Sequence, residues 1–561
     1  MQRTVSKPDR LPSWPVAWPP VGKGDPMSAQ SWQGIRHYTI PQRLEELARE
    51  KGSSTFARFG DWAPTYSEID RRAAELGGQL HALGAEPGDR VATLASNRYE
   101  LVELIVGVGK LGGVLVPLNP YLKGTFLKHQ LSDSEPTVLI TDSLGWKSVR
   151  PLLPDLPSIT AIVLLDPLED GSHPQVVDYA TLPHGPLPER DITPATTMAI
   201  VYTSGTTGEP KGCVLSHGYH ARVGETVAEL FDLVESDVII TPLPLFHAST
   251  QLSALMPALT RGIPVVFLPE FSASRFLKTA TEVGATILSG VGALASLLLA
   301  SPPGPHDRAH SLRIINLSPL DPALHPQFRE RFGVDPWSES YGQTECVFQT
   351  FLDSSSPRDR GGNGKSLRDL ELAVLDDDGQ PVADGEVGEI CIRPRHRFAM
   401  FDGYWRRPEA TLEAFRGLWF HTGDFGTVRE SGDIRFVDRK KDALRVRGEN
   451  VSSLELESAL LQYPDIAQAA VHAMASAVGE DDIKACLVLH DGHHLDIEKF
   501  FVWMTDNVPY FAVPRYMEIV DELPKNHVGR IHKHLLRERG RTSDTIDFHA
   551  RGLKIERAQR R

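Results

Sequence analysis

The chain has few cysteines. Only four occur in 561 residues, at positions 213, 346, 391 and 486, and no two of them form a C-x-x-C pair. This scarcity argues against a disulfide framework or a structural zinc site, and it fits a reducing cytoplasm. We therefore expect buried structural thiols, also at Cys213 and Cys346, which directly follow Gly212 and Glu345.

The sequence also lacks a long apolar segment. Its longest apolar region, Leu101–Val116, is broken by Glu103 and Lys110 and holds four glycines. A membrane-spanning helix needs about 20 apolar residues, so this region predicts a helix, a turn and a buried strand that ends at Pro117. No secretory signal is visible, and we expect a cytoplasmic protein that does not enter a membrane.

Positive charge is in deficit. Lys and Arg number 59 against 73 Asp and Glu, which gives a formal charge of −14. A chain with a net negative charge is a poor partner for nucleic acid, although a local patch of basic residues can still bind phosphates. The length predicts two or more domains. A homodimer is expected only as the commonest symmetric assembly.

The segment Tyr202–Gly212 has no P-loop pattern, yet its composition suits a phosphate. Its sequence, Y-T-S-G-T-T-G-E-P-K-G, holds three glycines and four Ser or Thr residues between an apolar run that ends at Val201 and a segment from Ser216 that can start a helix. Glycines let backbone N–H groups surround an anion, hydroxyls donate hydrogen bonds and Lys211 adds a charge. Composition alone leaves a surface loop as the alternative.

Short apolar runs alternate with helical patterns over most of the chain. The alternation predicts two doubly wound αβ subdomains, with ligands at the carboxyl ends of parallel strands. The expected strands are 90–94, 114–118, 137–141, 238–241, 264–268, 286–288 and 313–317, and the expected helices are 67–83 and 100–111. Short strands at 370–375, 388–393, 426–430 and 434–438 predict a small β barrel. The basic residues 438–442 resemble a linker, and the last hundred or so residues mix strands and helices in a separate small domain.

Five further segments form a series of short motifs. They are Pro242–Ala248 (P-L-P-L-F-H-A), Tyr341–Glu345 (Y-G-Q-T-E), Trp419–Asp424 (W-F-H-T-G-D), Arg445–Glu455 (R-V-R-G-E-N-V-S-S-L-E) and Leu523–Arg530 (L-P-K-N-H-V-G-R). With the phosphate-like segment they extend over about 44–536. In order and spacing they resemble the adenylate-forming superfamily of acyl-CoA synthetases, peptide-synthetase adenylation domains and luciferases. The string R-G-E-N-V-S-S resembles its carnitine/crotonobetaine-CoA ligase branch.

The resemblance implies an α/β fold with a large N-terminal domain and a small, mobile α+β C-terminal domain. Residues 35–438 would form the large AMP-binding domain, with the barrel at about 361–438. Residues 439–561 would form the small domain after a hinge. Residues 1–34 are rich in Pro and Trp and form an N-terminal extension to which we assign no function.

The resemblance also implies a nucleotide site. Thr344 would contact the α-phosphate, Tyr341 would stack on adenine, and Asp424 with Arg439 would bind the ribose. Glu345 would offer a hard carboxylate oxygen to Mg²⁺. The nucleotide-binding set is Thr203, Ser204, Gly205, Thr206, Thr207, Gly208, Lys211, Tyr341, Gly342, Thr344, Asp424 and Arg439.

At the other end of the site, the resemblance puts His247 beside the acyl group and Gly448 along the pantetheine tunnel of CoA. Lys441 would occupy the hinge, about which the small domain rotates between adenylation and thioester formation. Arg445 and Arg447 would meet the phosphates of CoA. From the residues alone, a structural histidine, a solvated basic linker and exposed arginines are the alternatives.

Two departures from the family pattern concern adenylation. In the family the last motif ends in a catalytic lysine, and this chain has Arg530 at that position. The planar guanidinium group of arginine cannot replace a compact ammonium group at a tight site without rearrangement. The glycine pair expected against adenine is missing from residues 315–320. One hypothesis is a divided ligase that receives an acyl adenylate, with a separate adenylating enzyme as partner, and transfers the acyl group to CoA. A full ATP-dependent synthetase is the other, and a carrier-loading enzyme and a non-catalytic binding relic are further alternatives.

The segment Ser289–Ala293 (S-G-V-G-A) lies where the family carries a bulkier turn beside the acyl pocket. Gly290 and Gly292 therefore predict a roomy, apolar floor for a large or polycyclic carboxylate. The expected ligands are a small-molecule carboxylic acid or its adenylate, ATP or acyl-AMP, CoA, and Mg²⁺ if adenylation occurs.

Overall fold

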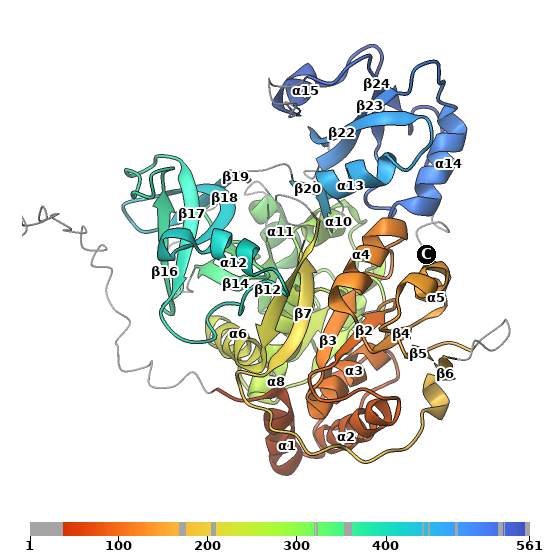
Figure 1. The fold of residues 1–561 in the computed structure, drawn as a ribbon. Coiled ribbons are helices and arrows are strands. Elements are labelled where there is room, and N and C mark those ends of the chain that lie inside the picture. Colours follow the sequence, from red (N-terminus) through yellow and green to blue (C-terminus); the bar gives the residue numbers. More distant parts are fainter. Residues whose placement is uncertain are drawn as a thin grey trace, which may run out of the picture.

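The computed structural model describes residues 37–167, 175–203, 209–318, 320, 324–352, 362–439, 443–446, 449–476, 481–524, 531 and 533–555. The predicted N-terminal extension lies outside the described residues. Two parallel sheets form the base of the molecule, antiparallel strands lie beside them, and the C-terminal part lies on top in the view of Figure 1.

The first parallel sheet has seven strands in the order β6-β5-β4-β2-β3-β7-β8. Adjacent strands of this sheet run parallel, except that β7 and β8 form an antiparallel pair. Fully buried strands such as β3 are typical of a sheet covered on both faces. Its strands are β2 (Arg90–Leu94), β3 (Val114–Leu118), β4 (Val138–Thr141), β5 (Ala161–Leu164), β6 (Val176–Asp178), β7 (Thr197–Thr203) and β8 (Lys211–Ser216). The helical elements of this region are α1 (Ile40–Glu50), α2 (Tyr66–Ala82), α3 (Tyr99–Leu111), α4 (Gly124–Ser134), α5 (Ser143–Val149), η1 (Arg150–Asp155) and η2 (Tyr179–Thr181).

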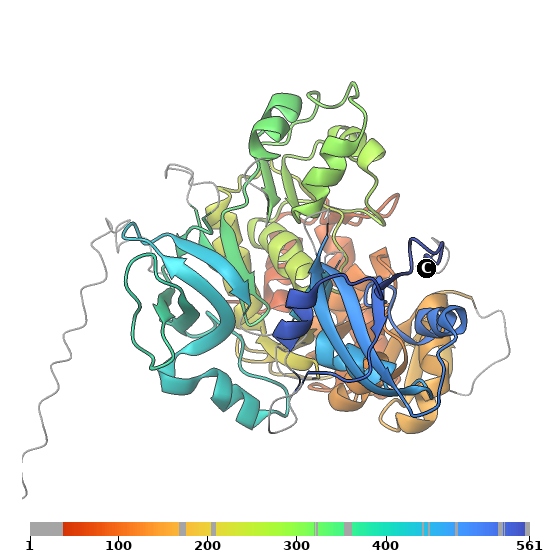
Figure 2. The same ribbon diagram turned by 90° about the horizontal axis from the view of Figure 1, so that it is seen from above.

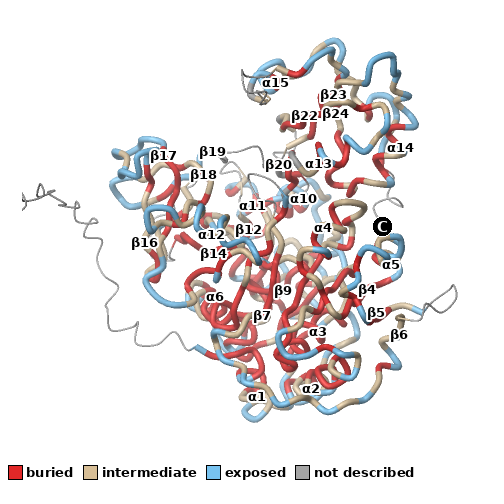
Figure 3. Tube along the Cα trace, viewed as in Figure 1, coloured by how far each residue is buried: buried red, intermediate tan, exposed pale blue. Residues whose placement is uncertain are grey.

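The second parallel sheet has five strands in the order β1-β10-β9-β11-β12. Both sheets share one core with α3, α6 and α8, and a separate core under α9, α10 and α11 covers the outer face of the second sheet. The strands of the second sheet are β1 (Ala57–Arg58), β9 (Ile239–Thr241), β10 (Val265–Phe267), β11 (Ile287–Gly290) and β12 (Ile314–Leu317). Its helices are α6 (His217–Leu230), α7 (Ala248–Thr250), η3 (Gln251–Leu255), α8 (Met256–Arg261), α9 (Ala273–Glu282), α10 (Ala293–Ala300) and α11 (Leu324–Phe332). Figure 3 shows that the buried residues concentrate in these strands and the helices between them.

Short antiparallel strands follow, in the region where the sequence predicts a barrel. They form a three-stranded sheet, β13-β14-β15, and a four-stranded sheet, β16-β17-β18-β19. The elements are β13 (Ser340–Gln343), β14 (Cys346–Phe351), β15 (Lys365–Ser366), β16 (Leu370–Leu375), β17 (Gly388–Pro394), α12 (Pro408–Ala414), η4 (Arg416–Leu418), β18 (Phe420–Val428) and β19 (Ile434–Arg439).

The C-terminal part packs on α4 of the large part. The Tyr121 and Tyr510 rings meet edge to face with centroids 4.9 Å apart, and the Lys123 ammonium donates to the Thr505 carbonyl at 3.2 Å. Seen from above, this part covers the first sheet while the antiparallel strands stay to one side (Figure 2). Its elements are β20 (Ala443–Val446), β21 (Glu449–Ser452), α13 (Ser453–Leu460), β22 (Ile466–Ala475), β23 (Asp481–Leu489), α14 (Ile497–Asn507), β24 (Tyr516–Ile519), α15 (Lys533–Arg539) and β25 (Ile546–Asp547).

The predicted α/β class is confirmed, and the strands expected at 90–94, 114–118 and 370–375 have those bounds. Two local predictions differ from the structure. Lys211 starts strand β8 instead of lying in a loop, and β19 continues through Arg439 into the expected linker. In both places a neighbouring strand supplies backbone hydrogen bonds that local composition does not reveal. In the described part of the chain, no helix is long and apolar enough to cross a membrane.

Candidate active site

Asp424, whose carboxylate is predicted to bind the ribose, lies in the middle of β18 and is 2% exposed. Its Oδ2 accepts hydrogen bonds from the Tyr341 hydroxyl at 2.6 Å and from the Gln343 side-chain amide at 2.9 Å. Gln343 also donates to the Thr422 carbonyl at 2.9 Å. These contacts hold the carboxylate in one orientation without help from a ligand.

Arg439 is the backbone partner of Asp424 across β18 and β19, so the two residues predicted for the ribose lie opposite each other. The Tyr341 ring stacks on Phe436 with centroids 6.2 Å apart. Its stacking on adenine stays a prediction, while its hydrogen bond to Asp424 is a feature that the sequence did not indicate. Sequence reasoning also missed Gln343, although it lies inside the Y-G-Q-T-E motif.

The residues on either side of the glycine-rich segment, Thr203 and Lys211, contact Cys213 and Tyr404. The Lys211 ammonium is 4.9 Å from the centre of the Tyr404 ring, and the Tyr404 hydroxyl donates to Glu345 Oε1 at 2.8 Å. Thr203 Oγ1 lies 3.8 Å from Cys213 Sγ across the β7–β8 pair. Burial and the nearby Glu345 carboxylate raise the pKa of Tyr404, so its hydroxyl stays a donor. Sequence reasoning missed Tyr404, since no motif contains it.

The Y-G-Q-T-E turn is fixed by Tyr219 on α6. The Tyr219 hydroxyl donates to the Thr344 carbonyl at 3.0 Å and accepts from the Val347 N–H at 2.6 Å. A Cβ at Gly342 would lie 2.6 Å from the Phe348 backbone nitrogen, so a larger residue does not fit. The turn is therefore rigid, and the contact of Thr344 with a phosphate stays a prediction.

Glu345 is 8% exposed and supplies a hard oxygen, which fits Mg²⁺, a cation that usually takes one or two carboxylates with phosphates and water. Apart from Glu345, the described residues include a cluster of candidate metal ligands. It consists of Glu389, Cys391 and His421, whose donor atoms lie within 4.8 Å of one another. Glu389 Oε2 already pairs with Arg416 at 3.1 Å and with His421 Nδ1 at 3.0 Å. We therefore assign no metal to that cluster.

All four cysteines are buried and unpaired in disulfides, as the sequence predicts. Burial raises the pKa of Cys346 to about 12 and also raises that of Cys213. Both stay protonated at neutral pH, so neither is a nucleophile.

The predicted acyl-side histidine, His247, directly precedes α7 and contacts the C-terminal part. Its Nε2 lies 3.2 Å from Glu449 Oε1, and its ring lies against Phe246 with centroids 4.3 Å apart. Glu449 starts β21 and pairs with Val446 across the β20–β21 hairpin. The contact therefore joins the turn after β9 to the hairpin of the R-V-R-G-E-N motif. Glu449 belongs to that motif, but sequence reasoning gave it no role.

The roomy floor expected at Gly290 and Gly292 stays a prediction, and the side of Gly290 on which a side chain would lie is filled. A Cβ at Gly290, the last residue of β11, would lie 2.7 Å from Leu294 Cδ1 and 2.9 Å from Leu317 Cδ2. Because side chains alternate along a strand, this position faces the core under α10, whereas Ser289 faces the opposite side. Gly292 lies at the N-cap of α10. Leucines thus fill the space that the missing side chain leaves.

Several predicted site residues lie outside the described residues, and their roles stay predictions. They are Ser204, Gly205, Thr206, Thr207, Gly208, Lys441, Arg447, Gly448 and Arg530. Arg445 is described by its backbone alone, in β20 opposite Asn450.

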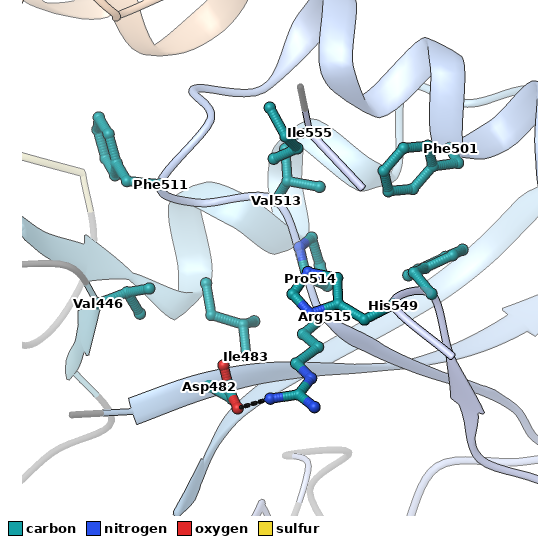
Figure 4. A pocket seen from close by; sticks show the side chains of 11 residues that line it. Val446, Asp482, Ile483, Phe501, Phe511, Val513, Pro514, Arg515, His549 and Ile555 are labelled. Atoms are coloured by element: carbon teal, nitrogen blue, oxygen red, sulfur yellow. Dashed lines mark hydrogen bonds and ion pairs between the residues drawn. The ribbon is translucent and has the colours of Figure 1, made fainter. Parts of the chain in front are cut away.

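A small pocket lies within the C-terminal part. Figure 4 shows Phe501, Phe511 and Val513 around it, with Arg515 hydrogen-bonded to Asp482 at 2.8 Å. None of the described residues predicted for the nucleotide or the acyl group lines it. The described motif residues instead make the contacts of Asp424 with Tyr341, of Glu345 with Tyr404 and of His247 with Glu449.

Comparisons with known proteins agree with this arrangement. Residues 44–405 match the model of the AMP-binding enzyme family, and residues 455–530 match the model of the AMP-binding enzyme C-terminal domain. The chain belongs to the AMP-binding enzyme family.

This AMP-binding enzyme is 34% identical over 484 residues to a crotonobetaine/carnitine–CoA ligase of Salmonella heidelberg (strain SL476), which covers 84% of this chain and 92% of the relative. Among solved structures, o-succinylbenzoate CoA synthetase (MenE) from Bacillus subtilis, bound with a product analogue, has a TM-score of 0.78 and 27% identity, covering 89% of this chain and 99% of that one. The amide bond synthetase McbA from Marinactinospora thermotolerans has a TM-score of 0.77 and 26% identity, covering 90% and 99%. The AMP-binding enzyme is accordingly an acid–thiol ligase of the adenylate-forming type.

Proposed function

We propose that the enzyme forms an acyl-CoA thioester from an acyl adenylate and CoA. The CoA sulfur attacks the carbonyl carbon of the mixed anhydride and forms a C–S bond. The bond between the carbonyl carbon and the phosphate oxygen of AMP breaks, AMP leaves, and the thiol proton passes to water. The ligands are a small-molecule carboxylic acid or its adenylate, with CoA as the acceptor.

The contact between His247 and Glu449 carries this proposal. It links the turn beside the expected acyl position to the hairpin that contains Gly448, which by resemblance lines the pantetheine tunnel. A thiol reaches the carbonyl only when this hairpin faces the acyl side, because the reacting atoms must approach to about 3–3.5 Å. The separation of 3.2 Å between His247 Nε2 and Glu449 Oε1 supports that orientation of the C-terminal part.

The nucleotide end supports the same proposal. The Asp424 carboxylate can accept hydrogen bonds from both ribose hydroxyls, and Lys211 with the segment 203–208 would surround the phosphate. Glu345 would hold Mg²⁺ if adenylation occurs, and the ion would neutralise phosphate charge. These residues would fix the adenylate while its carbonyl faces the acceptor.

We further propose that ATP-dependent adenylation is slow. Arg530 keeps the charge of the family lysine but not its compact shape, and losing such a group costs roughly 10²–10³ in rate. A separate enzyme would then supply the adenylate. A full ATP-dependent synthetase is the second candidate; the relative with 34% identity over 92% of its length is named a CoA ligase, which agrees with either candidate.

Two assays on the purified enzyme test these proposals. The first measures CoA consumption and AMP release with synthetic acyl adenylates, and the second measures ATP–pyrophosphate exchange with the same acids. We expect thioester formation, with exchange slower by about 10²-fold or more. Failure to form a thioester from any adenylate overturns the ligase. Exchange as fast as thioester formation overturns slow adenylation and leaves the full synthetase.

A further inference from the structure

Three neighbouring strands of the second parallel sheet carry a buried polar residue at or next to their last position. Ser289 of β11 pairs with Asn316 of β12, and Thr241 ends β9 on the other side of β11. Their exposed fractions are 1%, 6% and 0%. Ligands of parallel α/β sheets bind at the carboxyl ends of the strands, so this polar row occupies a position for ligand recognition.

The polar row faces the helical segment formed by α7 and η3. Along β11, Ile287 belongs to the core shared by the two sheets, whereas Leu288 belongs to the core under α9–α11. Side chains alternate along a strand, so Ser289 returns to the first face, with its pair partner Asn316 beside it. The Ser289 and Ser253 hydroxyls lie 3.0 Å apart, which agrees with this assignment.

One polar atom of the row and one of the helical segment have no hydrogen-bond partner in the part of the chain that the structure describes. Ser253 Oγ donates to the Ser249 carbonyl at 2.5 Å, so the proton between Ser253 and Ser289 comes from Ser289. Thr250 Oγ1 and Asn316 Oδ1 have no hydrogen-bond partner among the described residues. Thr250 is 0% exposed. Buried polar groups are normally paired, and here one hydroxyl and one amide oxygen are left over.

One of these groups, the Thr250 hydroxyl, belongs to the segment that directly follows His247. The Thr250 N–H donates to the His247 carbonyl at 3.2 Å. Thr250 is followed by η3, a π-helical turn, and such turns are frequent at functional sites. The Thr250 hydroxyl therefore lies beside the histidine that contacts Glu449, and Asn316 belongs to the sheet face on which Ser289 contacts this helical segment.

We infer that the acyl group of the substrate carries a neutral polar substituent, such as a hydroxyl, that binds between Asn316 and Thr250. The inference rests on the proposed function and names the substrate class of that site. The substituent donates its hydrogen to Asn316 Oδ1 and accepts one from the Thr250 hydroxyl. A hydrocarbon acyl group leaves both buried groups unpaired, and a site built this way discriminates against it.

Matched pairs of acids test the inference. Straight-chain and aromatic acids are each supplied with and without one hydroxyl, as free acids with ATP and as synthetic adenylates, and kcat/KM for CoA ester formation is measured. Calorimetry of the corresponding acyl-sulfamoyl adenosines measures binding without turnover. We expect at least one hydroxylated acid to exceed its unsubstituted partner by about 10-fold or more in both measurements.

Two variants locate the effect. Asn316→Leu and Thr250→Val should each reduce that ratio to about one, while Ile315→Val, on the opposite face of β12, should leave it unchanged. Thermal melts show that each variant is folded. Equal binding and turnover within every pair overturns the inference, and so does an unchanged ratio in the first two variants, which would mean that water satisfies the two atoms. A binding preference without any thioester overturns the proposed function and supports the inference.

Discussion

Asp424 and His247 stand at the two ends of the candidate site, and the structure holds them in different ways. Asp424 is 2% exposed and is fixed by Tyr341 and Gln343 from the same large part of the chain. The His247 side chain is 35% exposed, and it contacts Glu449 of the C-terminal part. Asp424 is thus fixed by residues of the large part alone, whereas the contacts of His247 include a residue of the C-terminal part.

This difference separates two tasks. The hydrogen bonds of Asp424 to Tyr341 and Gln343 do not depend on the C-terminal part, so the carboxylate predicted to bind the ribose can keep its orientation through a domain rotation. An acyl end that includes Glu449 exists only in orientations that bring the β20–β21 hairpin to His247. Substitutions at the first end should therefore affect both half-reactions, and those at the second end should affect one.

The largest effect is expected for Asp424→Ala. Loss of the carboxylate removes the hydrogen bonds predicted to two ribose hydroxyls, and kcat/KM with synthetic acyl adenylates should fall by about 10²–10³-fold. ATP–pyrophosphate exchange should fall alongside it. Asp384→Ala, at an exposed position, is the matched control and should change neither. A loss in only one assay would contradict a ribose end shared by both half-reactions.

Arg530→Lys should act in the opposite direction and on one step. A lysine restores the compact ammonium of the family motif, so pyrophosphate exchange should rise by about 10²-fold. CoA ester formation from a synthetic adenylate should stay within about twofold, because the adenylate is already formed. An unchanged exchange rate would show that Arg530 is not what slows adenylation.

Glu449→Ala is expected to have a smaller effect, confined to the second half-reaction. It removes the contact with His247, so thioester formation from a synthetic adenylate should fall by about 10-fold, while pyrophosphate exchange stays the same. Glu498→Ala, at an exposed position of α14, serves as the control. An equal loss in both assays would mean that Glu449 supports the fold and not the orientation of the C-terminal part.

The sequence predicted the fold better than it predicted the contacts of the site. Apolar strands such as Val114–Leu118 and the turn at Gly112, with φ of 74°, follow from local patterns, so their bounds could be predicted. The pairings of Tyr341 with Asp424 and of His247 with Glu449 join residues 83 and 202 positions apart. No local pattern indicates such pairs.

Gly290 shows the same limit in another form. The lack of a side chain at Gly290 predicted open space. Because side-chain directions alternate along β11, however, this position faces Leu294 and Leu317. The polar side of the same strand, at Ser289, becomes visible only when the register with Asn316 is known. The motifs thus predicted which segments contribute to the site, whereas the strand register determines which of their side chains point toward it.

The smallest effect is expected at Glu455, where the two parts of the chain meet. Burial raises the pKa of Glu455 to about 8, the Glu209 carboxylate of the large part adds to the shift, and Glu455 Oε1 has no hydrogen-bond partner among the described residues. The folded protein thus binds more protons than the unfolded chain between about pH 4.5 and 8, so the free energy of unfolding should fall as pH rises through that window and level off above it.

Glu455→Gln removes this titration. Its Tm should match the parent near pH 4.5 and exceed it by roughly 1–3 °C at pH 8, as measured by calorimetry at several pH values, with Glu498→Gln as the control. Because Glu209 lies on the large part and Glu455 on the C-terminal part, the same substitution should favour the observed contact between the parts at high pH. A constant Tm difference at every pH would mean that Glu455 is already ionised when folded, and that the meeting of the two parts does not depend on its proton.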